Sequence, residues 1–366
     1  MALGMTAASY TSSFSIMGKI NNIKTKSFTT FCAECITVLC TVILIVCLID
    51  KRRVFAYDES NNHTAKRWEY LYRYENKFPI DVMVLGNSHA YTGLLPEDMS
   101  QQLGKNCFIL ASQGNFLTDA YYMLKEALEI TSPELLVIET YLIREYNQKT
   151  LKAGDLTCQI QSFEARRNRW LKFISTMDLF SIENAPYAWS PTLRNHSYLF
   201  DNIDQLKYNL QHPAPPKYPN DIYLGRYVRF LSGIEQSVLE RYQKEGAPVD
   251  GSEMTVSQDA YIAMDMISAL CEEKGIKIMF LTLPMYKDHI SNYSAWKRNL
   301  SEFIEKYDYP WLDLQYNYNE GVFGPECFEN TYKKNQHMTA AGAMKASTIV
   351  TQYILNYLNL CNCLED

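Results

Sequence analysis

Ser88 follows a short apolar run, 82–85, with Gly86 between the run and the serine. A glycine at that position lets the chain turn sharply and leaves the serine hydroxyl exposed. A serine just past the end of a buried strand also lies where open α/β sheets bind their ligands. Ser88 is therefore a candidate nucleophile, and a strand-ending turn with a serine capping a helix is the simpler alternative.

Two further segments could complete a hydrolytic site around this serine. Gly114 and Asn115 lie in a loop after a second apolar run, and His337 lies in a loop before the C-terminal helix. A nucleophilic serine needs a base within hydrogen-bond reach and N–H donors for the oxyanion. His337 could be that base, and the backbone N–H of Gly114 with the side chain of Asn115 could be donors. Considered alone, His337 is more simply a surface histidine at a helix start.

The order of these motifs resembles that of the SGNH (GDSL-like) hydrolases. The resemblance is closest to their membrane-anchored branch, which includes D-alanyl-transfer and polysaccharide O-acetylation proteins. The segments that carry it are 86–93 (GNSHAYTG), 112–115 (SQGN) and 336–342 (QHMTAAG), and it covers roughly 80–360. It implies Ser88 as nucleophile and His337 as general base. It also implies the backbone N–H groups of Ser88 and Gly114 as oxyanion donors.

The chain departs from this family pattern at the catalytic acid. The family's acid stands three residues before the histidine, where this chain has Lys334, and the family's asparagine two residues after the histidine is Thr339. The asparagine of the third block is also absent after Glu139. Asn335 could hold the imidazole tautomer. Three carboxylates could replace the acid without any motif to select among them: Asp313, Glu326 and Glu329.

A triad without its acid can lose about four orders of magnitude in rate. Two functions therefore stay open. One is a serine acyl-esterase or O-acyltransferase that acts on a cell-envelope glycan, or on a lipid ester if the cleft is apolar. The other is a degenerate member that binds glycan or scaffolds a multispanning membrane acyltransferase. Hydrolysis and transfer are not distinguished.

The remaining chemistry-bearing residues are given structural roles. His89 is expected to point away from Ser88, because neighbouring side chains of an extended segment diverge, and His196 is expected in a solvated loop. Asp119 and Glu126 are expected on the solvated face of a helix. The sequence contains no phosphate-cradling glycine loop and no metal-ligand cluster, so we expect no metal and no cofactor.

Alternating strands and helices must position the candidate site. Their spacing predicts right-handed crossovers and a parallel sheet. We predict a doubly wound, flavodoxin-like α/β domain of five parallel strands over 81–360, with a mainly helical insertion at about 141–250. The predicted strands are 82–85, 107–110, 135–139, 276–283 and 311–314. The predicted helices are 96–103, 118–130, 163–176, 226–244, 256–274, 294–306 and 340–358.

A single apolar segment near the N-terminus predicts a transmembrane anchor. Residues 28–49 contain one charge, Glu34, and about 20 residues are enough to span a bilayer as a helix. Residues 1–27 form a polar tail in which Met17 is an alternative start, and 50–80 form a juxtamembrane connector. Basic residues balance on the two sides, so the positive-inside rule does not orient the chain. We expect the soluble domain outside the cytoplasm, as in the family branch it resembles.

Composition excludes other classes of protein. A chain of 366 residues with 47% hydrophobic and 21% charged residues is typical of a folded protein. Its net charge of −6 gives no basis for nucleic-acid binding. Four of its ten cysteines lie in the apolar segment, and none is part of a zinc-binding pattern.

Overall fold

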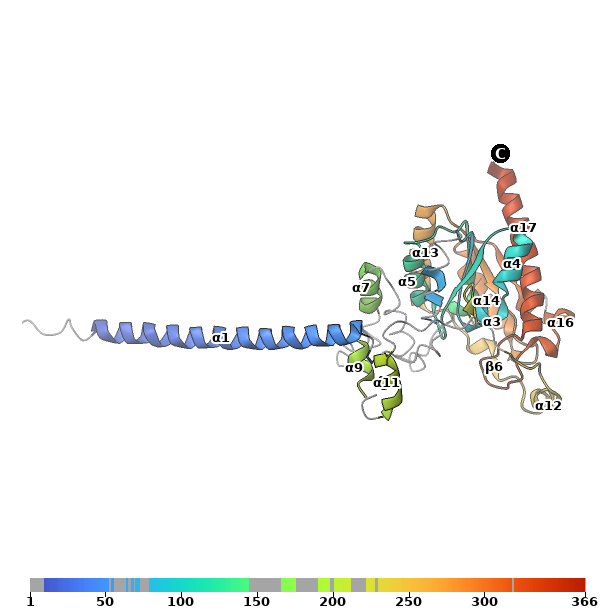
Figure 1. The fold of residues 1–366 in the computed structure, drawn as a ribbon. Helices are drawn as coiled ribbons and strands as arrows, with labels where there is room; N and C mark the ends of the chain where they lie inside the picture. The colour runs from blue at the N-terminus through green and yellow to red at the C-terminus, as the bar shows by residue number, and fades with distance from the viewer. Residues whose placement is uncertain are drawn as a thin grey trace, which may run out of the picture. The chain divides into compact units, whose positions relative to one another are not determined.

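The computed structural model (Figure 1) describes residues 10–52, 54–55, 64, 67–68, 70–72, 79–144, 166–175, 190–197, 201–211, 222–227, 230–317 and 319–365. Much of the predicted connector and much of the predicted insertion lie outside these residues. The chain divides into two compact units, which are described separately. One comprises 1–57 with 190–215, and the other comprises 58–189 with 216–366.

The larger unit is built on a five-stranded sheet in which every pairing is parallel. The strands are β1 (Val82–Gly86), β2 (Cys107–Ala111), β3 (Leu135–Glu139), β7 (Lys277–Thr282) and β9 (Trp311–Asp313), and their order is β2-β1-β3-β7-β9. The strand order reverses at β1, because β2 lies on one side of it and β3 on the other, as in doubly wound folds. The predicted fold class and all five predicted strands are confirmed.

Helices cover both faces of this sheet, as the near-complete burial of its strands requires. Met83 and Leu85 of β1 share an apolar core with α5 (Leu117–Ala127), α13 (Gln258–Lys274) and α14 (Tyr293–Glu305). Val82 and Val84, which point the other way, pack with α4 (Pro96–Leu103) and α17 (Ala340–Glu365). Figure 1 shows α5 and α13 on one side of the sheet and α4 and α17 on the other. The alternation of strand side chains thus supplies two cores.

A short helix, α3 (Ser88–Gly93), follows β1 where a loop was predicted. Gly86 makes this close approach possible, because an added Cβ would lie 2.3 Å from the Cβ of Ala90. Real Cβ atoms do not approach so closely, so a larger residue would push α3 away from the strand. The sharp turn that glycine permits therefore sets the position of α3.

Two predictions about the helices are wrong. The helix expected over 226–244 begins later, as α12 (Gln236–Glu245). Arg226 and Tyr227 instead form β5, which pairs with β4 (Ile222–Tyr223) in an antiparallel hairpin. The turn between them contains Leu224 and Gly225, both with positive φ, which a helix does not tolerate. The Leu224 carbonyl accepts a hydrogen bond from Ile109 N, so the hairpin covers part of the edge strand β2.

The second wrong prediction is the solvated face of α5. Asp119 and Glu126 are buried beneath α7 (Arg166–Ser175). Lys172 forms a buried ion pair with Asp119. Asn168 donates to Glu126 at 2.9 Å, and Tyr72 donates to the same carboxylate at 2.7 Å. Buried carboxylates need such partners, and the partners come from segments that α5's own sequence does not reveal.

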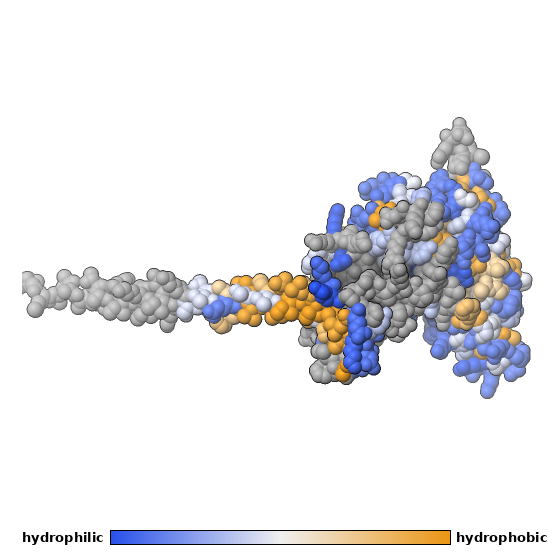
Figure 2. Space-filling view, in the orientation of Figure 1, coloured by the Kyte–Doolittle hydropathy of each residue, from blue (hydrophilic) through white to orange (hydrophobic). Residues whose placement is uncertain are grey.

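The smaller unit contains α1 (Tyr10–Lys51), α9 (Pro191–Asn195) and α11 (Ile203–Gln211). Residues 27–51 of α1 are long and apolar enough to cross a membrane. Figure 2 shows the apolar surface of this helix reaching its C-terminal end. A helix of this kind near the N-terminus fits either a membrane anchor or a signal sequence.

Candidate active site

Ser88 is the first residue of α3, just past the end of the interior strand β1. The helix cap is Asn87, whose side-chain oxygen accepts a hydrogen bond from His89 N at 3.0 Å. The alternative role of Ser88 as the capping residue is therefore wrong, and its hydroxyl is not used for capping. Its backbone N–H belongs to the first turn of a helix, where N–H groups lack partners within the helix. Ser88 thus combines a hydroxyl with an N–H directed outward from the same helix start.

His337 lies in a tight loop that folds back on itself before α17. Phe328 and Met338 form an antiparallel bridge, and Glu329 N donates to the His337 carbonyl at 2.8 Å. Residues 329 and 337 therefore lie directly opposite each other, as in an antiparallel ladder, where facing Cβ atoms are about 5 Å apart. Thr339 follows and caps α17, since its hydroxyl accepts from Gly342 N at 3.3 Å.

This fold-back brings a carboxylate to the histidine. Oε2 of Glu329 lies 3.0 Å from Nδ1 of His337. The other two carboxylates considered from the sequence are engaged elsewhere: Asp313 accepts from the Tyr293 hydroxyl at 2.9 Å, and Glu326 pairs with Lys345 at 2.9 Å. Of these three carboxylates, Glu329 is therefore the one that contacts His337, from a position eight residues before it.

Lys334, at the family's acid position, takes no part in this contact. Its side chain is 78% exposed and pairs loosely with Glu253 at 3.9 Å. A carboxylate eight residues before the histidine, instead of three, can reach the imidazole only because the chain folds back over 328–338. No sequence motif marks that fold-back.

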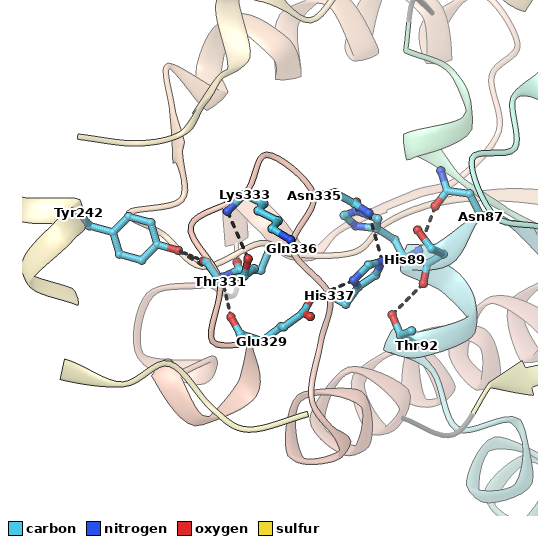
Figure 3. Close-up of polar contacts among 11 residues, drawn as sticks. Asn87, His89, Thr92, Tyr242, Glu329, Thr331, Lys333, Asn335, Gln336 and His337 are labelled. Atoms are coloured by element: carbon cyan, nitrogen blue, oxygen red, sulfur yellow. Dashed lines mark hydrogen bonds and ion pairs between the residues drawn. The ribbon is translucent and has the colours of Figure 1, made fainter. Parts of the chain in front are cut away.

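The hydrogen bonds around His337 select one tautomer (Figure 3). Glu329 only accepts, so Nδ1 of His337 carries the proton and Nε2 is an acceptor. The side-chain nitrogen of Asn335 then donates to Nε2 at 3.3 Å, and its oxygen accepts from Nε2 of His89 at 3.0 Å. Each donor in this series of hydrogen bonds thus faces an acceptor. In this arrangement Nε2 of His337 is an acceptor, as a general base requires.

His89 is part of this site, contrary to the sequence prediction. Ser88 and His89 lie on a helix rather than in an extended segment, so their side chains do not point to opposite faces. The His89 ring stacks on Tyr141 at 4.0 Å between centroids and lies 5.7 Å from the His337 ring. Burial, together with the nearby His337, holds the pKa of His89 well below its usual value, so His89 is neutral.

The helix that begins with Ser88 contacts the segment that carries His337. A Cβ added to Gly93, at the end of α3, would lie 3.3 Å from Sδ of Met338. Met338 directly follows His337, and His89 directly follows Ser88. These contacts bring the predicted nucleophile and the predicted base to neighbouring elements at the end of the sheet.

The loop after β2 lies at the same turn. Gly114 has φ +63°, a conformation that glycine adopts without strain. The side-chain nitrogen of Asn115 lies 3.2 Å from the Gly86 carbonyl and 3.3 Å from Sδ of Met123. Both N–H groups of this amide are thus engaged, and they tie the loop to the start of α3. The oxyanion roles of Gly114 and Asn115 stay predictions.

A buried polar cluster holds the loop of His337 in place. Gln336 accepts from Tyr286 N at 2.8 Å and donates to the Tyr242 hydroxyl at 3.3 Å. The Tyr242 hydroxyl also donates to the Thr331 carbonyl at 3.1 Å and lies 2.7 Å from Nδ1 of His289. Burial lowers the pKa of His289 to about 4, so this histidine is neutral and acts in support. Such a shell fixes the geometry of the groups it surrounds.

Glu139, which sequence reasoning did not select, ends β3 beside the turn after β1. Its Cβ would lie 3.4 Å from a Cβ at Gly86, and one carboxylate oxygen accepts from Tyr141 N at 3.0 Å. Burial raises the pKa of Glu139 to about 8. Its position as an acidic residue at the carboxyl end of a predicted parallel strand could have identified Glu139 from the sequence. His196, in the smaller unit, is exposed, as predicted.

The fold and these contacts define a doubly wound α/β protein with serine, histidine and glutamate at the carboxyl end of its sheet. No protein-family model and no curated protein matches the chain. Solved structures do match it, and the three described next have TM-scores below 0.5.

Three of these structures come from bacteria. A proposed acylhydrolase from Bacteroides fragilis has 12% identity, a TM-score of 0.35, and coverage of 82% of this chain and 99% of its own. A GDSL-like lipase from Bacteroides thetaiotaomicron has 12% identity, a TM-score of 0.35, and coverage of 80% and 99%. An acetyl xylan esterase from Butyrivibrio proteoclasticus has 8% identity, a TM-score of 0.29, and coverage of 77% and 64%.

Proposed function

We propose that this chain is a membrane-anchored serine acyl-esterase or O-acyltransferase of the SGNH type. Its substrate would be a small acyl ester, such as acetyl, on a cell-envelope glycan. The observation that carries the proposal is the contact between Glu329 and Nδ1 of His337, which supplies the carboxylate that the motif lacks. The binding-only alternative rested on the absence of that carboxylate, so the contact favours the enzyme.

The first half of the reaction would acylate the serine. Ser88 Oγ attacks the acyl carbonyl carbon while Nε2 of His337 takes the hydroxyl proton, and Glu329 stabilises the imidazolium that forms. The backbone N–H groups of Ser88 and Gly114 donate hydrogen bonds to the developing oxyanion. Collapse of the intermediate breaks the ester bond, and His337 returns its proton to the departing alcohol oxygen.

The second half would release the acyl group. Water, or a hydroxyl of an acceptor sugar, attacks the acyl-serine as Nε2 of His337 removes its proton. The bond between the acyl carbon and Ser88 Oγ then breaks, and His337 returns the proton to Oγ. Water gives a free acid and hydrolysis, whereas a sugar hydroxyl gives transfer. In the structure Asn335 contacts Nε2, so its amide must yield this position when Ser88 gives up its proton. Asn335 would then hold the base ready between turnovers.

An envelope substrate would suit the proposed location of the chain. A chain anchored by residues 27–51 with its α/β domain outside the cytoplasm would keep a serine esterase beside a membrane acyl donor or a nascent polysaccharide. A multispanning membrane acyltransferase is the partner that would supply such an acyl group.

The proposal is tested with the detergent-solubilised full chain. Acetate release from acetylated oligosaccharides would be compared with hydrolysis of p-nitrophenyl esters of increasing chain length, beside Ser88→Ala. We expect Ser88-dependent activity on acetyl esters that falls as the acyl chain grows. Preference for long chains would favour a lipid ester, and the absence of Ser88-dependent turnover on every ester would favour a binding role.

A further inference from the structure

The end of the apolar helix α1 is bound by α9. Asp50, next to the last residue of α1, accepts from the Ser190 hydroxyl at 2.7 Å through one carboxylate oxygen. Its other oxygen accepts from Thr192 N at 2.8 Å and from the Thr192 hydroxyl at 2.5 Å. Hydrogen bonds to an ionised carboxylate are about twice as strong as neutral ones. Asp50 therefore fastens the start of α9 to the end of α1.

Two buried amides extend this attachment to α11. Asn195 donates to the Phe55 carbonyl at 2.8 Å, and Asn209 of α11 donates to the Val54 carbonyl at 3.1 Å. Both asparagines are less than 10% exposed. The carbonyls they bind follow α1 directly, and all these residues belong to one compact unit. Both α9 and α11 are thus fixed where the apolar helix ends.

The outer face of α11 carries an apolar stripe. Ile203 is 50% exposed and Leu210 is 59% exposed, and the partly buried Leu206 lies between them. Residues three, four and seven apart share one face of a helix. Lys207 borders this face with a side chain that is 66% exposed and lies 3.5 Å from the Asp204 carboxylate, whereas Asn209 binds the Val54 carbonyl just after α1. An apolar stripe beside a lysine is the pattern of a helix that lies in a membrane interface.

Helix length sets the depth of this stripe. The 25 residues from Ser27 to Lys51 extend about 37 Å at about 1.5 Å per residue. A hydrocarbon core is about 30 Å thick, and the bilayer with its headgroups is about 40–45 Å. The end of α1 therefore reaches the headgroup layer. Because α11 is bound to the residues that follow at once, its stripe lies at the same level.

We propose that α9 and α11 form an interfacial collar on the lipid bilayer. The stripe of Ile203, Leu206 and Leu210 enters the boundary between headgroups and acyl chains. Three exposed cations, Lys51, Arg52 and Lys207, face the lipid phosphates. The collar rests on the proposed membrane anchoring of α1. It would fix the depth at which the chain leaves the membrane, which a single helix on a free linker does not do.

The collar is tested by lipid quenching of added tryptophans in the full chain, reconstituted into phosphatidylcholine–phosphatidylglycerol vesicles. The lipids carry bromine near the top of their acyl chains. Leu210→Trp reports on the stripe. Ile262→Trp is the matched control, because Ile262 of α13 is equally apolar and 50% exposed in the other unit. Leu44→Trp, within α1, reports on the anchor. Wild type supplies the background of the five native tryptophans.

We expect brominated lipid to remove the added fluorescence of Leu210→Trp and to leave that of Ile262→Trp unchanged. Quenching of Leu44→Trp without quenching of Leu210→Trp would overturn the collar and leave the anchor standing, and would favour a protein partner for the stripe. A Leu44→Trp signal that lipid does not quench would overturn the anchor and the collar together.

Discussion

Glu329 and His337 are paired across a fold-back of the chain, with Oε2 of the glutamate 3.0 Å from Nδ1 of the histidine. The backbone reinforces the pair, since Glu329 N donates to the His337 carbonyl at 2.8 Å. Side-chain and main-chain contacts thus hold the same two residues together. The imidazole is fixed in one orientation with its proton on Nδ1.

This pairing makes Glu329 the group whose removal should be most costly after Ser88 and His337. Glu329→Gln keeps the shape but removes the negative charge that stabilises the imidazolium, so we expect kcat for p-nitrophenyl acetate to fall by about two to four orders of magnitude. Glu326→Gln is the matched control and should retain wild-type activity, because its side chain pairs with Lys345 instead. Equal rates for Glu329→Gln and wild type would remove Glu329 from the mechanism.

His89 should act through Asn335. His89→Phe keeps a ring to stack on Tyr141 but loses the 3.0 Å hydrogen bond to Asn335. A neutral hydrogen bond contributes about 0.5–1.5 kcal/mol, so we expect kcat to fall roughly two- to tenfold with KM unchanged. Steady-state kinetics with p-nitrophenyl acetate measure both constants. A change confined to KM would show that His89 contacts substrate instead.

Stability should depend on pH through Glu139. Its folded-state pKa is raised to about 8 from an unfolded value of 4.5, so the folded chain binds the proton more tightly. This contribution is fully present below pH 4.5 and is lost as pH rises to about 8, and it amounts to a few kcal/mol at most. Glu139→Gln cannot ionise, so its Tm should fall less than that of wild type between pH 5 and pH 8.

Thermal unfolding of the two proteins at both pH values measures this difference. The control is Glu134→Gln, at a half-exposed carboxylate that pairs with Lys105. It should follow the wild-type pH dependence. Parallel curves for wild type and Glu139→Gln would mean that Glu139 is already ionised in the folded chain.

The buried ion pair of Asp119 and Lys172 should affect stability mainly because each charge neutralises the other. Lys172→Met leaves Asp119 buried without its cation, which costs about 3–5 kcal/mol. We expect Tm to fall by about 5–10 °C. The double variant Asp119→Leu with Lys172→Met should recover most of this loss. If the single and double variants unfold at the same temperature, the ion pair is not the source of the effect.

Periodic features of the sequence predicted the fold well. Apolar runs marked four of the five strands, because a parallel sheet is buried on both faces, and the mixed segment 311–314 marked the fifth. Glycines at helix ends, such as Gly104 and Gly275, marked boundaries through their positive φ. These are local signals, and each depends only on residues near it in the chain.

Contacts between distant segments could not be predicted in this way. Asp119 and Glu126 gave no sign of burial, because α7 covers them from a separate part of the chain. Glu329 could not be selected from the sequence for the same reason, since no residue pattern predicts the pairing of 328 with 338. His89 was misplaced because the short helix α3 was taken for an extended segment.

Ser88, His337 and Glu329 together would form the proposed acyl-serine site. The most direct measurement treats the full chain with a fluorophosphonate and locates the adduct by mass spectrometry. The account predicts an adduct on Ser88 that is absent in Ser88→Ala and greatly slowed in His337→Ala and Glu329→Gln. A folded wild-type chain that forms no adduct, or forms it on another residue, would contradict the account.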